Sequence, residues 1–210
     1  MNKSLCFLSG LILALSVLLG AIILPALSVE RFETALLSTV DGQALGMSES
    51  GLSAFAEETM RYLRGQKPAW EPDVPFAIAE AFRVHMAEVR GWVSAAPWVI
   101  GCGLLVGLGA LWLGRRQRGP VLLGVWAFVG FVLCVLIWAA VDFRSFWMVL
   151  HRVLIPGGIF ASGEPIMLLF PLSLFFRYIV PVGLCAAGML TALCLLLILL
   201  TSRARGGRES

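Results

Sequence analysis

Four stretches of the chain are long enough and apolar enough to cross a lipid bilayer, and this leaves few folds open. They run from Leu5 to Leu27, from Trp92 to Gly114, from Val121 to Val141 and from about Val180 to Leu200. A spanning helix needs about 20 mostly apolar residues, because the hydrocarbon core of a bilayer is about 30 Å thick. The composition agrees, since 59% of the 210 residues are hydrophobic and only 14% are charged. We therefore predict an all-α integral membrane protein with four transmembrane helices.

The first apolar stretch follows Lys3, and Ala26-Leu27-Ser28 looks like a signal-peptide cleavage site. Its apolar run exceeds the usual 7–15 residues of a secretory signal, so we interpret it as an uncleaved span. Five segments follow from this reading: a first transmembrane helix (1–27), a helical subdomain (28–91), two further spans joined by an Arg-rich turn (92–141), an interfacial or re-entrant loop (142–179), and the last span with its tail (180–210).

The basic residues that flank the spans predict the orientation of the chain. Lys3, the turn 114–119 and the tail 202–208 carry seven basic residues on one side of the membrane, where Glu209 is the only acid. Short cytoplasmic segments carry an excess of Lys and Arg. We therefore expect both termini in the cytoplasm and the two longer loops on the extracytoplasmic side. The net charge of +3 is a topology signal and does not indicate nucleic-acid binding.

The first loop predicts two helices. Apolar residues recur at helical spacing from Leu52 to Leu63, and Gly65 ends the pattern; Gln66–Pro75 is then a connector. Asp73 and Pro75 are expected to open a second helix that runs to Gly91, with Ile78, Phe82, Met86 and Val89 as its apolar stripe and His85 at the stripe's edge. This helix leads into the second span, which places His85 near the membrane surface.

Glycines between Gly101 and Gly109 favour close helix packing in lipid.

The second loop is too apolar to be fully solvated and too short to span. Phe143–Ile155 predicts an interfacial or re-entrant helix that ends at Pro156-Gly157-Gly158. Ile166–Leu174 is a second short apolar run, broken by Pro171 before Pro181 starts the last span. Irregular backbone at this depth needs protein or a cavity to cover it, so we expect the two loops to fold onto each other.

The only two histidines, His85 and His151, fall in these two loops. With an unperturbed pKa near 6.5, one imidazole can take a proton while the other donates one. Each histidine can also be a hydrogen-bonded packing residue with no catalytic role.

Together with Glu88, the two histidines can instead form a two-histidine, one-carboxylate metal site in a membrane hydrolase. A non-enzymatic accessory subunit or a transporter is a further alternative, although a transporter should carry charge within its spans. The loop arginines, Arg83, Arg90, Arg144, Arg152 and Arg177, suit contacts with phospholipid headgroups or a substrate carbonyl.

Three short segments resemble the bacterial lipoprotein intramolecular transacylase (Lit) family. The segment Phe82-Arg-Val-His85-Met86-Ala-Glu88-Val89-Arg90 resembles the family's H-M-x-D-V-K/R motif before the second span. The segment from Phe146 through His151 to Gly157 resembles its F-x-x-x-F-H-x-x-x-F-P-G motif, and Met167–Pro171 resembles its L-I-x-L-F-P run. The order of the segments also agrees. The chain departs from the pattern at Glu88, Leu150 and Ile159.

The resemblance implies an acyltransferase of the bacterial cell membrane with its active site on the extracytoplasmic face. It would move an acyl chain from the diacylglyceryl group of a lipoprotein's N-terminal cysteine onto that cysteine's α-amino group, giving the N-acyl lyso-form without a cofactor or a metal. The substrates would be diacylglyceryl-modified lipoproteins within the phospholipid bilayer. In this reading His85, supported by Glu88, is the base and His151 donates to the oxyanion and leaving group, and the reverse division of these two roles stays open. Arg83 and Arg152 would support the site or bind substrate.

Overall fold

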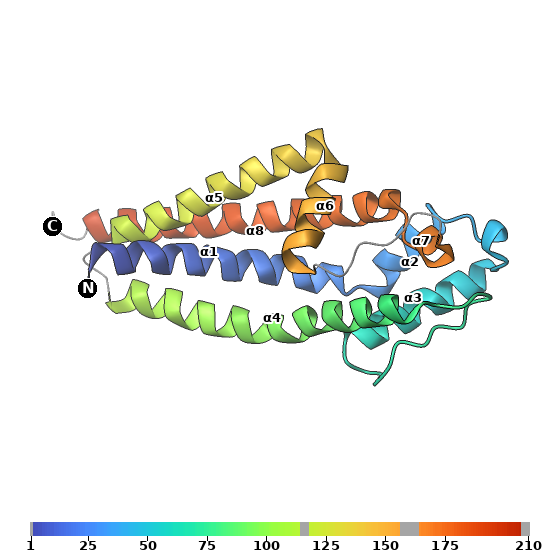
Figure 1. Cartoon of the computed structure of the whole chain (residues 1–210). Helices are drawn as coiled ribbons and strands as arrows, with labels where there is room; N and C mark the ends of the chain where they lie inside the picture. The colour runs from blue at the N-terminus through green and yellow to red at the C-terminus, as the bar shows by residue number, and fades with distance from the viewer. Residues whose placement is uncertain (1, 114–117, 156–163, 207–210) are drawn as a thin grey trace. The chain divides into compact units, whose positions relative to one another are not determined.

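The computed structural model describes residues 2–113, 118–155 and 164–206, and the described chain is helical (Figure 1). The elements are α1 (Lys3–Ala26), α2 (Val29–Leu37), the 3₁₀ turn η1 (Gln43–Leu45), α3 (Glu49–Leu63), α4 (Glu80–Leu113), α5 (Arg118–Val141), α6 (Phe143–Leu154), α7 (Pro165–Leu169) and α8 (Leu172–Gly206). Four helical stretches are long and apolar enough to cross a membrane: Lys3–Ala26, Glu80–Leu113, Gly119–Val141 and Pro165–Leu196. The predicted all-α class with four spans is confirmed.

The chain divides into two compact units. The first comprises Met1–Ile22, Ala96–Ile137 and Gly183–Ser210, and contains the apolar lengths of α1, α4, α5 and α8. The second comprises Ile23–Ala95 and Trp138–Val182. It therefore holds α2, α3, the start of α4, α6, α7 and the start of α8.

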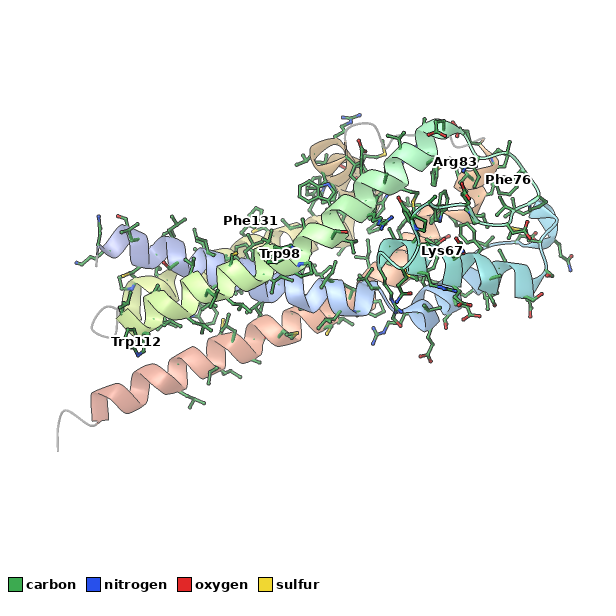
Figure 2. The ribbon with its side chains drawn as sticks, turned by 90° about the horizontal axis from the view of Figure 1, so that it is seen from below. Lys67, Phe76, Arg83, Trp98, Trp112 and Phe131 are labelled. Atoms are coloured by element: carbon green, nitrogen blue, oxygen red, sulfur yellow. The ribbon has the colours of Figure 1, made fainter. Side chains whose placement is uncertain are left out.

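Glycines bring the helices of the first unit close together. A Cβ atom built on Gly10 of α1 would lie 2.1 Å from the carbonyl oxygen of Val121, and one on Gly124 of α5 would lie 2.1 Å from that of Phe7. On α4, a Cβ on Gly103 would meet the Ser16 hydroxyl at 2.0 Å. Small residues let helix backbones approach in this way within a membrane. Large apolar side chains on the outside of this unit, such as Trp98, Trp112 and Phe131, are exposed (Figure 2), as expected for helices that face lipid.

The second unit has an aromatic core built from both loops. Phe55 of α3, Trp70 of the connector, Phe82 of α4 and Phe170 after α7 are all at least 90% buried, and their ring centroids lie 5.5–6.5 Å apart in five pairs of this set. The buried indole N–H of Trp70 donates to Oγ1 of Thr59 at 3.1 Å. The donor is therefore buried without the free-energy cost of an unsatisfied hydrogen bond. The expected folding of the two loops onto each other is therefore found within this unit.

The helix that carries His85 begins later than the sequence predicts. It starts at Glu80, not at Asp73 or Pro75. In the preceding segment Val74, Phe76 and Ile78 are half-buried and pack on the aromatic core, while the residues between them are exposed. This alternation is the two-residue period of extended backbone, so the segment covers the core as an extended strap. A helix here would turn some of the three apolar side chains away from the core. The end of α3 at Leu63, followed by Gly65 with φ +77°, is as predicted.

The last span also begins earlier than predicted. α8 starts at Leu172, directly after Pro171, and runs through Pro181 without ending. Neighbouring groups can compensate for a proline within a transmembrane helix, which is why Pro181 was a poor start signal. The helix expected over Phe143–Ile155 is found as α6, and the short run before Pro171 contains α7; the interfacial position of α6 stays a prediction. The predicted terminator Pro156-Gly157-Gly158 lies outside the described residues.

Candidate active site

The start of α4 fixes His85 in the second unit. Phe82 and Met86, one turn apart, are 3% and 5% exposed and anchor this face of the helix in the core. His85 lies between them, is half-buried, and its ring centroid is 5.7 Å from that of Phe82. It precedes Trp92, where the apolar stretch of the helix begins, by seven residues. His85 therefore lies ahead of the span predicted from Trp92 to Gly114.

The helix α6 fixes His151. Asp142 caps the helix by accepting a hydrogen bond from the Ser145 N–H at 2.9 Å. One turn before its C-terminus, Nδ1 of His151 lies 3.0 Å from the carbonyl oxygen of Trp147. A carbonyl only accepts, so Nδ1 carries the hydrogen and the lone pair of the neutral ring is on Nε2. The Trp147 ring lies 4.5 Å from the imidazole and stacks on Phe175 at 4.3 Å, so the ring orientation is also held by packing.

The two imidazoles face each other across one cavity. Their ring centroids are 6.0 Å apart and the rings are nearly parallel, at 28°. Both line a cavity of about 710 Å³ within the second unit. The rest of its lining is mainly apolar and includes four methionines, Met60, Met86, Met148 and Met167, together with aromatic and aliphatic side chains such as Phe170 and Phe175. Arg144 also contributes to the lining. Flexible thioether side chains adapt to ligands of varied shape.

Both histidines are held toward the neutral form. Burial, and secondly the nearby His151, lower the pKa of His85 from 6.5 to about 4. Burial also lowers the pKa of His151, although the hydrogen bond to Trp147 opposes this by favouring the protonated ring. At neutral pH each ring therefore offers one N–H donor and one acceptor nitrogen. Such a pair can accept a proton and stabilise a developing negative charge at the same time.

The other predicted site residues lie apart from the two imidazoles. Glu88 is exposed and lines a separate, smaller hollow with Gly91, Trp92 and Leu154. Arg83 (Figure 2) reaches Glu80 at 4.0 Å, and Arg152 is exposed. Neither arginine contributes to the lining of the histidine cavity. The set His85, Glu88 and His151 is not assembled: among residues 2–113, 118–155 and 164–206, no three His, Cys, Asp or Glu side chains come close enough to share a metal ion.

Sequence reasoning missed the roles of two residues. Arg144 was grouped with four other arginines for contact with headgroups or a substrate carbonyl and was not singled out, and it lines the cavity. Trp147 holds His151 through both its carbonyl and its ring. The signal for Trp147 was its position four residues before a histidine on a helix, because that spacing places a side chain over the preceding turn.

Fold and site together define a four-span integral membrane protein with a pair of neutral histidines in a largely apolar cavity. The fold is similar to that of the membrane integral lipoprotein intramolecular transacylase Lit from Bacillus cereus, with a TM-score of 0.75, 17% sequence identity and 97% of each chain covered. Structures of that protein with an H85R mutation and with an H85A mutation, in its own numbering, also match, each with a TM-score of 0.72 and 17% identity. Their alignments cover 98% and 97% of this chain and 94% and 95% of theirs.

The family model for "Lipoprotein intramolecular transacylase Lit" matches residues 7–158, which include both histidines. The chain therefore belongs to the Lit family and is an acyltransferase. No curated protein matches the sequence.

Proposed function

We propose that this chain transfers an acyl chain from the diacylglyceryl group of a lipoprotein's N-terminal cysteine to the α-amino group of the same cysteine. The amine nitrogen forms a C–N bond with the ester carbonyl carbon, and the C–O bond to glycerol breaks. The nitrogen loses one proton and the departing glycerol oxygen gains one, so an ester and an amine become an amide and a hydroxyl. The observation that carries the proposal is the pair of facing imidazoles, 6.0 Å apart, in an apolar cavity.

His151 is the proton acceptor in this proposal. Its Nδ1–H donates to the Trp147 carbonyl, which leaves the Nε2 lone pair free to take the amine proton and then pass it to the glycerol oxygen. The imidazolium that forms transiently keeps the same hydrogen bond, which stabilises it. This assignment reverses the one made from sequence.

His85 is the donor to the oxyanion. Burial, together with His151, lowers its pKa to about 4, which makes it a poor base and keeps it neutral, and a neutral imidazole still has an N–H to donate. A donor aimed at the carbonyl oxygen in a cavity with little water is worth far more than in solution, and loss of one such donor typically costs about 10²–10³ in rate. Because Glu88 is exposed and lines the other hollow, the His85 role does not require its carboxylate.

The substrate's chemistry fits the apolar lining of the cavity. Acyl chains fill space between methionine and aromatic side chains, and exclusion of water protects the ester from hydrolysis, the reaction that competes with transfer to the amine. Since donor and acceptor belong to one molecule, orientation alone supplies much of the rate. The basic residues at the termini and in the turn 114–119 favour a location in the bacterial cytoplasmic membrane with the cavity on the extracytoplasmic side.

The test is expression in a bacterial host whose lipoproteins carry a free N-terminal amine. We compare the wild-type chain, His85→Gln and His151→Gln at matched membrane levels, with Arg61→Gln as control, because Arg61 is an exposed α3 residue outside the cavity. Tandem mass spectrometry of one lipoprotein's N-terminal lipopeptide should show the N-acyl, S-monoacylglyceryl form with wild type and Arg61→Gln. Each histidine variant should lower the transfer rate by about 10²–10⁴. An unchanged lipopeptide in cells with the wild-type chain would exclude the proposed reaction.

A further inference from the structure

A hydrogen bond joins the two helices that carry the histidines. The indole N–H of Trp92 on α4 donates to the carbonyl oxygen of Leu154 on α6 at 3.1 Å. Trp92 lies seven residues after His85, which puts both on the same face of α4, and Leu154 lies three residues after His151. The two helices therefore meet at two places within the second unit: at the imidazole pair and at this bond.

The bond uses groups that the end of α6 makes available. The last four carbonyls of a helix have no partner within it. Leu154 is the final residue of α6, and the Ile155 N–H turns back to the His151 carbonyl at 2.7 Å. The Trp92 indole, which can only donate, supplies a partner for the Leu154 carbonyl. Trp92 as a residue is 55% exposed, so burial does not explain its position, and the hydrogen bond is its specific contact with α6.

The spacing gives this bond leverage over the site. From the bond to the histidine the distance is seven residues, about 10.5 Å, along α4 and three residues, about 4.5 Å, along α6; a 10° pivot about the bond therefore moves His85 by about 1.8 Å if α4 pivots, or His151 by about 0.8 Å if α6 pivots. A misplacement of about 1 Å in reacting groups can cost about 10²-fold in rate. Two helices that touch at one point can pivot, whereas two that touch at two separated points cannot. The bond therefore suits control of the imidazole separation.

We propose that Trp92 is a positioning residue whose indole N–H holds α6 against α4 and so sets the distance between His85 and His151. This inference rests on the proposed function for its effect on rate, but its geometric content does not depend on activity. In this role Trp92 acts through the two helices that carry the histidines. Arg144 is a charged residue that also lines the cavity. It is unchanged in every variant below, so differences between variants do not come from it.

The first measurement is the kinetics of Trp92→Phe on a synthetic diacylglyceryl lipopeptide in lipid. Phenylalanine keeps an aromatic ring at the membrane interface and removes only the donor. The expected result is a fall in kcat of about three- to tenfold, the size of one net hydrogen bond, with KM within about twofold of wild type. The control is Trp98→Phe, an exposed tryptophan on the same helix that lies outside both hollows, and it should match wild type.

The second measurement distinguishes positioning from a general structural effect. Because the chain has only two histidines, histidine-selective isotope labelling and NMR report each imidazole separately once any tag is removed. Replacing His151 with Ala should raise the pKa of His85 in the wild-type background, because the charge on His151 lowers it. In the Trp92→Phe background the same replacement should raise it by less, since the rings are then further apart.

The outcomes separate the two claims. A wild-type kcat and an unchanged coupling between the histidines in Trp92→Phe would overturn the positioning role while the transacylase proposal stands. A lower kcat with unchanged coupling, or an effect confined to KM, would also overturn it. If His85→Gln and His151→Gln transfer acyl chains at the wild-type rate, the histidine mechanism fails, and the NMR result alone then decides whether Trp92 sets their separation.

Discussion

Acidification from pH 7 to pH 5 should leave His85 almost uncharged. A histidine with the ordinary pKa of 6.5 is about 97% protonated at pH 5. Burial, together with His151, lowers the pKa of His85 to about 4, and with that value only about 9% of the rings are protonated at pH 5. The effect is large because solvent is excluded from one side of the ring by Phe82 and Met86.

The assay is a pH titration followed by NMR on protein labelled only at histidine, in lipid nanodiscs. Two signals are expected, since the chain has two histidines. The His85 signal should have its midpoint well below 6.5. The His151 midpoint should also lie below 6.5, because burial lowers its pKa against the opposing effect of the hydrogen bond to Trp147. A His85 midpoint at 6.5 or above in the wild-type chain would refute the argument from burial.

The same pKa shift has a consequence for stability. When the folded-state pKa lies below the unfolded one, the unfolded chain binds more protons as the pH falls below 6.5. Titration of His85 therefore lowers the unfolding free energy progressively as the pH falls from about 6.5 to about 4. Above pH 6.5 it does not change the unfolding free energy with pH. His151 contributes in the same direction. Thermal unfolding in detergent, compared between wild type and His85→Ala, should show the wild-type Tm falling more steeply over this interval.

Two further predictions concern packing. Gly124→Ala should lower the unfolding free energy by about 1–3 kcal/mol, because its Cβ would lie 2.1 Å from the Phe7 carbonyl oxygen. The control Gly130→Ala, whose Cβ would have nothing within 4 Å, should be neutral or slightly stabilising. Thermal unfolding in detergent compares the two variants. Thr59→Val should cost about 1–3 kcal/mol by leaving the buried Trp70 N–H without its acceptor, and a Tm equal to that of wild type would contradict this account.

The membrane class and most helices could be predicted because their signals are local. A run of 20 apolar residues has one stable arrangement in a bilayer, and the capping Asp142 and the terminating Gly65 act within one turn. The start of α4 could not be predicted from such signals. Asp73 and Pro75 are good helix starters, but the strap formed by Val74, Phe76 and Ile78 gains more by covering the aromatic core in extended form.

The site could be predicted only in part for a similar reason. Scarcity drew attention to His85 and His151, and the structure places both in one cavity. Glu88 was chosen because it follows His85 by three residues, yet α4 packs so that this carboxylate stays exposed. Trp147 could be found only from its position four residues before His151, whereas Trp92 acts through a contact across 62 residues that leaves no pattern in the sequence.

An apolar cavity with two neutral histidines suits an intramolecular transfer better than it would suit hydrolysis. Hydrolysis needs a positioned water molecule and tolerates a wet, charged site, whereas transfer to an amine in the same molecule needs water kept out and the amine kept uncharged. Burial of His85 and His151 serves both needs, because the same desolvation that lowers their pKa values disfavours an ammonium group beside them. In the proposed mechanism, the lowered pKa values of the two histidines and the uncharged form of the substrate amine therefore have the same cause.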